Sequence, residues 1–151
     1  MKITVMSRQK AIEYCSEAHR VKSAIISISD PRVEYNAAPQ KTQENNVAGI
    51  LRLCFSDADR PGVDVYGNVV SESDLLSDKD AEKIARFVNR YKDINIIVHC
   101  DAGISRSSGV AAAIMFYLWH DDSEIFDSPR YYPNMWCYRK VLNALMKYSR
   151  K

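Results

Sequence analysis

Apolar residues occur along this chain in two patterns, short continuous runs and longer segments with an apolar position every three or four residues. The continuous runs predict strands at residues 2–6, 23–29, 47–55 and 94–100. The longer segments predict helices at residues 7–17, 77–92, 106–119 and 134–148. Strands that alternate with helices predict an α/β domain around a central, mainly parallel sheet of about four to five strands, flanked by helices.

Polar residues mark the ends of the predicted helices and the segments between them. Ser7 can cap the first helix, and the stretch from Ser77 to Asp80 resembles a capping box for the second. The third helix is apolar on nearly every side, so it should lie in the centre of the domain. The remaining segments are predicted loops at residues 31–46 and 121–133 and a small hairpin at residues 63–70.

Length and charge limit the function classes. The chain has 151 residues, and we expect residues 1–151 to form one domain with a sizeable core. Lys and Arg total 21 against 19 Asp and Glu, a net charge of +2 with no basic run, so no nucleic-acid partner is expected. No apolar run is long enough to span a bilayer and no secretion signal is visible, so we expect a cytoplasmic protein without a membrane partner.

The four cysteines are widely spaced and include no C-x-x-C pair. A metal site is therefore not expected, and free thiols are the default in a reducing compartment. Cys15, Cys54 and Cys137 are interpreted as small core hydrophobes, with a redox role as the alternative. Cys100 differs from them because of its neighbours.

Cys100 lies in the stretch NIIVHCDAGISRSSG, residues 95–109, between a predicted buried strand and a predicted buried helix. In a parallel sheet, ligands bind at the carboxyl ends of strands beside helix N-termini. A loop of small residues there can curl its N–H groups around a phosphate, and Gly103 supplies unusual backbone angles. The planar guanidinium of Arg106 can hold two phosphate oxygens. The same positive groups would stabilise a thiolate at Cys100.

The segment HCDAGISRS resembles the phosphate-binding loop of the cysteine-dependent protein tyrosine phosphatase superfamily, closest to the small dual-specificity phosphatases. The resemblance implies that Cys100 is the nucleophile and that Ser107 assists breakdown of a cysteinyl-phosphate. It implies that His99 is a buried organiser of the loop, and it implies no metal or other cofactor. The phosphate would be bound by Arg106 and by the loop residues Asp101, Ala102, Gly103, Ile104 and Ser105.

The reaction also needs a general acid, which the family carries on a loop after an earlier strand. Here the segment LRLCFSDAD offers Asp57 and Asp59 after the third predicted strand. Asp57 is the first choice because it comes directly after the strand, and Asp59 is the alternative. The other of the two is expected to cap the following turn. Pro133 and Asn134 resemble the start of the last helix in dual-specificity phosphatases, although both residues also suit a helix start for capping alone.

The loop itself indicates the substrate class. Residues 101–105 include no lysine, and Asp101 would repel a polyanion. We therefore expect a phosphorylated protein or small phosphoester as substrate, phosphotyrosine first and then phosphoserine or phosphothreonine, with phosphate or sulfate ion as a ligand of the empty site. Tyr35 and Tyr66 are candidates for the pocket wall, or for loop packing. Two other classes stay open: a phosphate-recognising module without hydrolysis, and a sulfur- or arsenate-handling enzyme.

Overall fold

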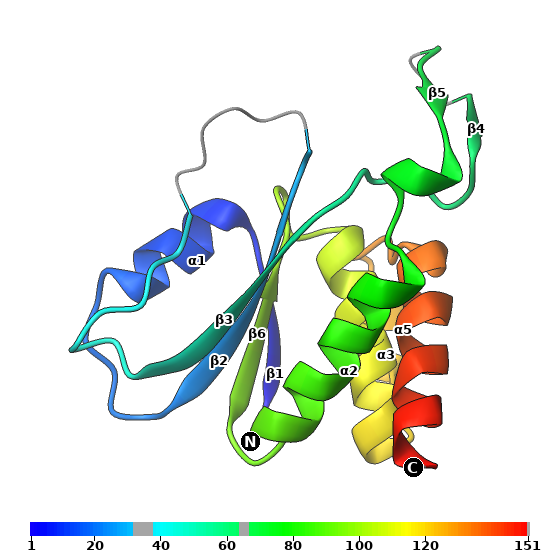
Figure 1. Cartoon of the computed structure of the whole chain (residues 1–151). Helices are drawn as coiled ribbons and strands as arrows, with labels where there is room; N and C mark the ends of the chain where they lie inside the picture. The colour runs from blue at the N-terminus through cyan, green and yellow to red at the C-terminus, as the bar shows by residue number, and fades with distance from the viewer. Residues whose placement is uncertain (32–37, 64–66, 151) are drawn as a thin grey trace.

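The computed structural model describes residues 1–31, 38–63 and 67–150, and the elements below lie in these ranges. Their arrangement is drawn in Figure 1. In chain order they are β1 (Ile3–Met6), α1 (Arg8–Cys15), β2 (Ser23–Ser29), β3 (Val47–Cys54), β4 (Gly62–Val63), β5 (Val69–Val70), a 3-10 turn (Glu72–Asp74), α2 (Asp78–Tyr91), β6 (Asn95–His99), α3 (Arg106–Trp119), α4 (Ser123–Phe126) and α5 (Met135–Ser149).

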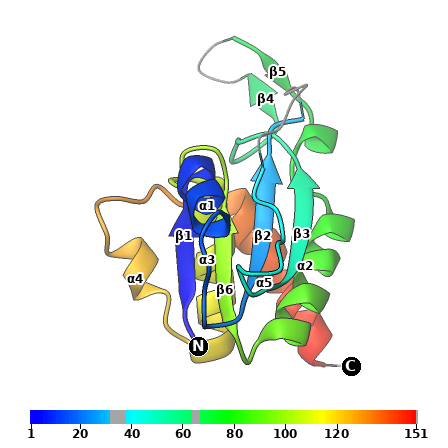
Figure 2. The same ribbon diagram turned by 90° about the vertical axis from the view of Figure 1, so that its left-hand side faces the viewer.

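The central sheet has four strands in the order β1-β6-β2-β3, and every pair in it is parallel. The expected α/β class is therefore confirmed. β6 occupies an inner position between β1 and β2, with Ile25 of β2 aligned to Ile97 of β6 on one side and to Ile50 of β3 on the other. In Figure 2, α1 covers one face of the sheet, and α2, α3 and α5 cover the other.

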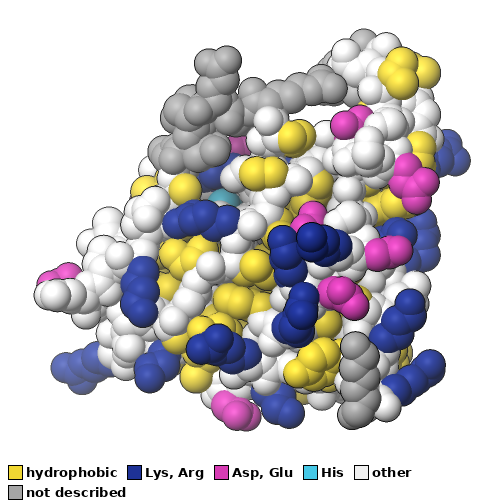
Figure 3. All heavy atoms as spheres, in the orientation of Figure 1, with side chains coloured by type: hydrophobic (Ala, Val, Ile, Leu, Met, Phe, Trp, Pro, Cys, Tyr) yellow, Lys and Arg dark blue, Asp and Glu magenta, His cyan; other side chains and the backbone are white. Residues whose placement is uncertain are grey.

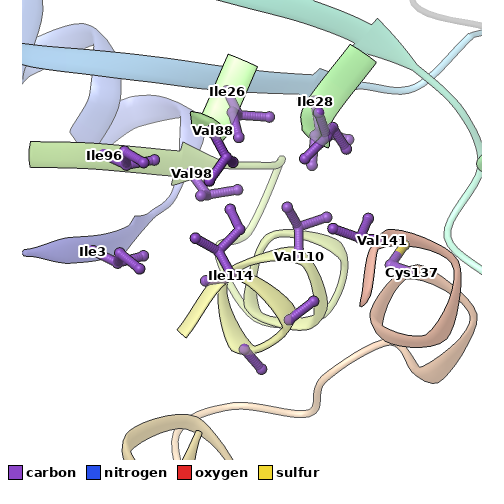
Figure 4. Close-up of a cluster of buried hydrophobic side chains, with 14 of the residues drawn as sticks. Ile3, Ile26, Ile28, Val88, Ile96, Val98, Val110, Ile114, Cys137 and Val141 are labelled. Carbon is purple, nitrogen blue, oxygen red and sulfur yellow. The ribbon is translucent and has the colours of Figure 1, made fainter. Parts of the chain in front are cut away.

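The main core lies between the sheet and α3, with α2 and α5 closing it from the side. Figure 4 shows Ile26 and Val98 from the sheet facing Val110 and Ile114 from α3. α3 is buried from Arg106 to Met115, as expected for a helix that is apolar on nearly every side. Within the described ranges, no helix combines the length and apolar character needed to cross a bilayer.

The structure corrects two expectations about local structure. The predicted loop at residues 121–133 contains the short helix α4, whose Ile125 is buried against the core. A helix of four residues is too short to show apolar periodicity. Cys15 and Cys137 are buried as expected, but Cys54 is exposed, because it follows the buried Leu53 on the edge strand β3 and so faces the opposite side.

The two short strands of the predicted hairpin also pair. β4 and β5 pair in antiparallel fashion, with Gly62 aligned to Val70 and Val63 aligned to Val69. Both predicted N-caps are present, whereas the predicted capping box from Ser77 to Asp80 is formed only on its Ser77 side. Ser7 accepts a hydrogen bond from the Lys10 amide, and Ser77 accepts one from the Asp80 amide. These caps fix where α1 and α2 begin.

Candidate active site

The carboxyl ends of all four parallel strands meet at one edge of the sheet, at the top of Figure 1, where α3 and α5 begin. Ser7 follows β1, Asp30 follows β2, Asp57 lies shortly after β3, and Cys100 follows β6. The parallel order thus gathers residues that are far apart in sequence. This is the edge at which open α/β sheets bind ligands.

The loop at residues 101–105 is held against the junction of β1 and α1. Gly103 has a φ of +72°, and a Cβ at this position would lie 2.6 Å from the Ser7 nitrogen. The Arg8 amide donates to the Asp101 carbonyl over 3.1 Å. Only glycine satisfies both the backbone conformation and the close approach.

The other side of the loop is fixed through its carbonyl groups. Ser108 Oγ donates to the Ile104 carbonyl at 2.6 Å and to the Ser105 carbonyl at 3.0 Å. The Tyr132 amide also binds the Ile104 carbonyl, and the Asn134 amide binds the Ser105 carbonyl. These carbonyls are therefore occupied on the outside of the loop, which favours an inward orientation of its amides.

Cys100 is 3% exposed, and its Sγ lies 3.1 Å from Ser107 Oγ. Burial raises the pKa of the Cys100 thiol, but hydrogen bonds from the Ser107 side chain and from the Ser107 and Gly103 amides outweigh it, together with the charge of Arg106. The net effect lowers the pKa of this thiol. A thiolate has no proton, so the Ser107 hydroxyl donates to it. The site therefore stabilises the nucleophilic form of cysteine.

His99 is fully buried and binds at both ring nitrogens. Its Nδ1 lies 3.0 Å from the Cys100 carbonyl oxygen, and its Nε2 lies 2.6 Å from Ser27 Oγ. A carbonyl oxygen only accepts, so Nδ1 carries the proton and the Ser27 hydroxyl donates to Nε2. Burial, as the largest influence, lowers the pKa of His99. The ring is therefore neutral near pH 7, and it orients the backbone of Cys100.

Arg106 is 4% exposed and is held at one end of its guanidinium group. Its Nη1 donates to Asp30 Oδ1 at 3.0 Å and to the Phe55 carbonyl at 2.9 Å. Its Nε is buried and has no hydrogen-bond partner in the described part of the chain. A buried guanidinium N–H without an acceptor is unfavourable unless a ligand supplies one. A tetrahedral oxyanion bound to the loop is the acceptor that this geometry fits.

The two candidate acids after β3 have different environments. Asp57 Oδ1 accepts hydrogen bonds from Ser105 Oγ at 2.9 Å and from Asn134 Nδ2 at 2.8 Å, so Asp57 lies against the loop. Asp59 Oδ1 instead accepts from the Met135 amide at 3.0 Å, at the start of α5. The geometry places Asp57 beside the thiol-bearing loop and gives Asp59 a capping contact.

Solved structures share this architecture over nearly the whole chain. Human DUSP28 is 14% identical over 97% of this chain and 90% of its own, with a TM-score of 0.60. The human tyrosine phosphatase-like serine/threonine/tyrosine-interacting protein is 17% identical over 98% and 91%, with a TM-score of 0.58. PTPMT1 in complex with PI(5)P is 15% identical over 99% and 93%, with a TM-score of 0.58. No protein-family model matches the sequence, and no curated protein matches it.

The chain has the fold of the small dual-specificity phosphatases. The resemblance seen in HCDAGISRS is thereby confirmed at the level of the fold. In this phosphatase fold, the loop at residues 101–105 connects the inner strand β6 to the buried helix α3.

Two residues that contact the site, Arg8 and Asp30, were not among the candidates from the sequence. Arg8 Nε lies 3.5 Å from Asp101 Oδ1, and Arg8 Nη2 donates to Ser29 Oγ at 3.0 Å, so Arg8 joins the loop to the end of β2. Asp101 is 67% exposed, and its charge is partly balanced by Arg8. Asp30 holds Arg106 and likewise lay outside the motif. The sequence signal for Asp30 is its place directly after a predicted strand, and that for Arg8 is its place at the start of the first predicted helix.

The remaining site expectations concern aromatic walls and metal ions. Tyr35 and Tyr66 lie outside the described residues. Across residues 1–31, 38–63 and 67–150, no three His, Cys, Asp or Glu side chains are grouped as metal ligands.

Proposed function

We propose that this protein is a phosphomonoester hydrolase that removes phosphate from phosphotyrosine, and also from phosphoserine or phosphothreonine, through a cysteinyl-phosphate intermediate. One observation carries the proposal: a thiol whose pKa is lowered shares a short loop with a buried arginine whose Nε has no acceptor. The first group is a nucleophile and the second is an anion receptor. A phosphoryl group bound in the loop would contact both.

In the first half of the reaction, the Cys100 thiolate attacks phosphorus and the bond from phosphorus to the ester oxygen breaks. The leaving oxygen takes a proton from the carboxyl group of Asp57. Both hydrogen bonds to Asp57 fall on Oδ1, so Oδ2 is the oxygen that carries this proton. Arg106 and the loop amides stabilise the charge on the equatorial oxygens.

In the second half, the Asp57 carboxylate removes a proton from water, and the water oxygen attacks the phosphorus of the cysteinyl-phosphate. The bond between sulfur and phosphorus breaks, and inorganic phosphate and the Cys100 thiolate are released. Ser107 Oγ, 3.1 Å from Sγ, donates a hydrogen bond to the departing sulfur and makes it a better leaving group. His99 stays neutral and keeps the Cys100 carbonyl in place.

The loop supports a phosphoprotein or phosphotyrosine-like ester as the substrate class. It adds no lysine to Arg106, and the Asp101 carboxylate at its rim is 67% exposed. A headgroup with several phosphates would meet this carboxylate and no additional loop cation. The structure of PTPMT1 with PI(5)P shows that a protein of similar fold binds a phosphoinositide, so a phosphoinositide belongs in the substrate screen.

The test is turnover of para-nitrophenyl phosphate, phosphotyrosine peptide, phosphothreonine peptide and phosphoinositide by the wild-type chain, by Cys100→Ser and by Arg106→Lys. We expect turnover of the first two substrates, competition by inorganic phosphate, and loss of activity in both variants. Arg106→Lys keeps the charge but removes the planar pair of donors. Tight binding of phosphotyrosine peptide without turnover by the wild-type chain would instead identify a non-catalytic phosphate-recognising module.

A further inference from the structure

A groove of about 590 Å³ lies between α2 and α5, on the side of these helices away from the sheet. Its floor is made of small side chains, Ala81 and Ala85 from α2 and Ala144 from α5, together with the ring of Trp136. The alanines are short, so the longer side chains on either side of them extend past the floor and form the two walls of the groove. The groove is separate from the loop that carries Cys100.

The walls of the groove are strongly basic. They carry five Lys or Arg side chains and only two carboxylates, an excess of three positive charges where the whole chain has a net charge of +2. Figure 3 shows Lys and Arg side chains over α2 and along the right-hand edge, where α5 lies, with Asp and Glu side chains among them. Cations concentrated along a concave surface attract an acidic partner.

Most of these cations form no close ion pair in the described part of the chain, although the charge of Lys147 also acts on Asp78. Lys140 Nζ lies 2.8 Å from Asp78 Oδ1 and 5.0 Å from the centre of the Trp136 ring. In the described part of the chain, the other four form no ion pair: these are Lys79, Arg86, Arg139 and Lys147. These four side chains lie on both helices, so the carboxylates of one bound segment can form ion pairs with both walls of the groove.

We propose that the groove between α2 and α5 is a docking site for an acidic segment of a partner protein, with apolar side chains of that segment packed on Trp136 and the alanine floor. An apolar floor between charged walls matches a peptide that alternates carboxylates with apolar residues. A flat anionic surface such as a membrane would contact the walls but not the recessed floor. The proposal does not depend on the chemistry at Cys100.

Binding is tested by fluorescence anisotropy with a fluorescein-labelled peptide of 12 residues that alternates Glu and Leu, and with the same peptide carrying Lys in place of Glu. The wall variant combines Arg139→Glu with Lys147→Glu, and both positions are exposed on α5. The matched control is Arg20→Glu combined with Lys22→Glu, which changes net charge equally at exposed positions between α1 and β2. Circular dichroism melting verifies that each variant is folded.

We expect the Glu/Leu peptide to bind, the Lys/Leu peptide not to bind, and added salt to weaken binding. The wall variant should bind about tenfold more weakly, and the control variant within about twofold of the wild type. Cys100→Ser should bind as the wild type does. Equal binding of the two peptides, or equal weakening in the wall and control variants, would overturn the proposal. So would displacement of the peptide by phosphatidylserine vesicles that bind more tightly, since a membrane surface would then be the occupant.

Discussion

Asn134 Nδ2 donates a hydrogen bond to Asp57 Oδ1 over 2.8 Å, although the two residues are 77 positions apart in the sequence. The other end of the same amide caps α5, because Asn134 Oδ1 accepts from the Cys137 amide at 3.0 Å. Asn134 Nδ2 also donates to the Ala58 carbonyl at 3.1 Å. One side chain therefore fixes both the start of α5 and the position of the proposed acid.

These two contacts of Asn134 can be separated by substitution. Asn134→Asp keeps an oxygen for the Cys137 amide, but it loses the donor and places a second carboxylate beside Asp57, where the two like charges repel each other. Asn134→Ala loses both contacts and should lower stability by about 1 kcal/mol through the cap. Turnover against pH and thermal melting should show a displaced pH profile with a nearly unchanged melting temperature for Asn134→Asp. Identical pH profiles for wild type and Asn134→Asp would show that the contact does not position the acid.

Asp57 and Asp59 should respond differently to removal of their charge. Asp57→Asn should lower turnover of aryl phosphates by about 10²-fold to 10⁴-fold, most for poor leaving groups, because the proton donor is lost. Asp59→Asn retains an oxygen for the Met135 amide and should change turnover little. The measurement is turnover across a series of aryl phosphates with leaving groups of different pKa. If Asp59→Asn shows the larger and leaving-group-dependent loss, Asp59 is the acid.

The reactivity of Cys100 should begin at a lower pH than that of an ordinary thiol. The pKa of this thiol is lowered in the folded protein, so the thiolate fraction rises with pH through a midpoint below that of an ordinary thiol. Ser107→Ala removes one donor and should move the midpoint to higher pH. The midpoint is measured by iodoacetamide alkylation against pH, with the modified cysteine identified by peptide mass. The experiment uses a Cys54→Ser background because Cys54 is exposed.

The same alkylation experiment has an internal control. Cys137 is buried, and burial raises its pKa far above the ordinary range, so it should stay unmodified while the protein is folded. A Cys100 midpoint at or above the ordinary thiol value would contradict the proposed nucleophile.

Gly103→Ala should destroy anion binding by the loop. The substitution places a Cβ 2.6 Å from the Ser7 nitrogen at a φ of +72°, so the loop must move away from the junction of β1 and α1. Gly67→Ala is the matched control, because Gly67 has a φ of +83° and no atom of the described residues lies within 4 Å of the added Cβ. The control should lose about 1 kcal/mol of stability at most. Vanadate inhibition and thermal melting together distinguish displacement of the loop from backbone strain alone.

Local signals in the sequence were sufficient for most elements of the fold. β2 spans Ser23–Ser29 as predicted, because a continuous apolar run is bounded by charged and proline residues. The buried positions of α2 that the spacing indicated, including Ile84 and Val88, are buried. The sequence did not predict α4, because four residues are too few to show helical periodicity. The exposure of Cys54 depends on the position of β3 at the edge of the sheet, and the sequence alone does not give the strand order.

The site was predictable where its residues follow one another along the chain. The spacing of His99, Cys100 and Arg106 identified the loop without any structure. Asp30 could not be found in this way, and Asn134 was noted only as a helix start and not as a partner of Asp57, because each residue contacts its partner across 76 or 77 positions of sequence. Contacts of this range depend on strand order and helix packing, and these are properties of the assembled sheet.

β6 lies between β1 and β2 although it is the last of the four strands along the chain. During translation, β2 and β3 can pair early, but the sheet stays open until residues 95–99 have left the ribosome. The amides that surround the Cys100 sulfur take their places only after α3 has followed. In a chain that has not folded, the Cys100 thiol therefore has an ordinary pKa and is mostly protonated at neutral pH. The larger thiolate fraction of Cys100 therefore arises only when β6 and α3 have both taken their places in the fold.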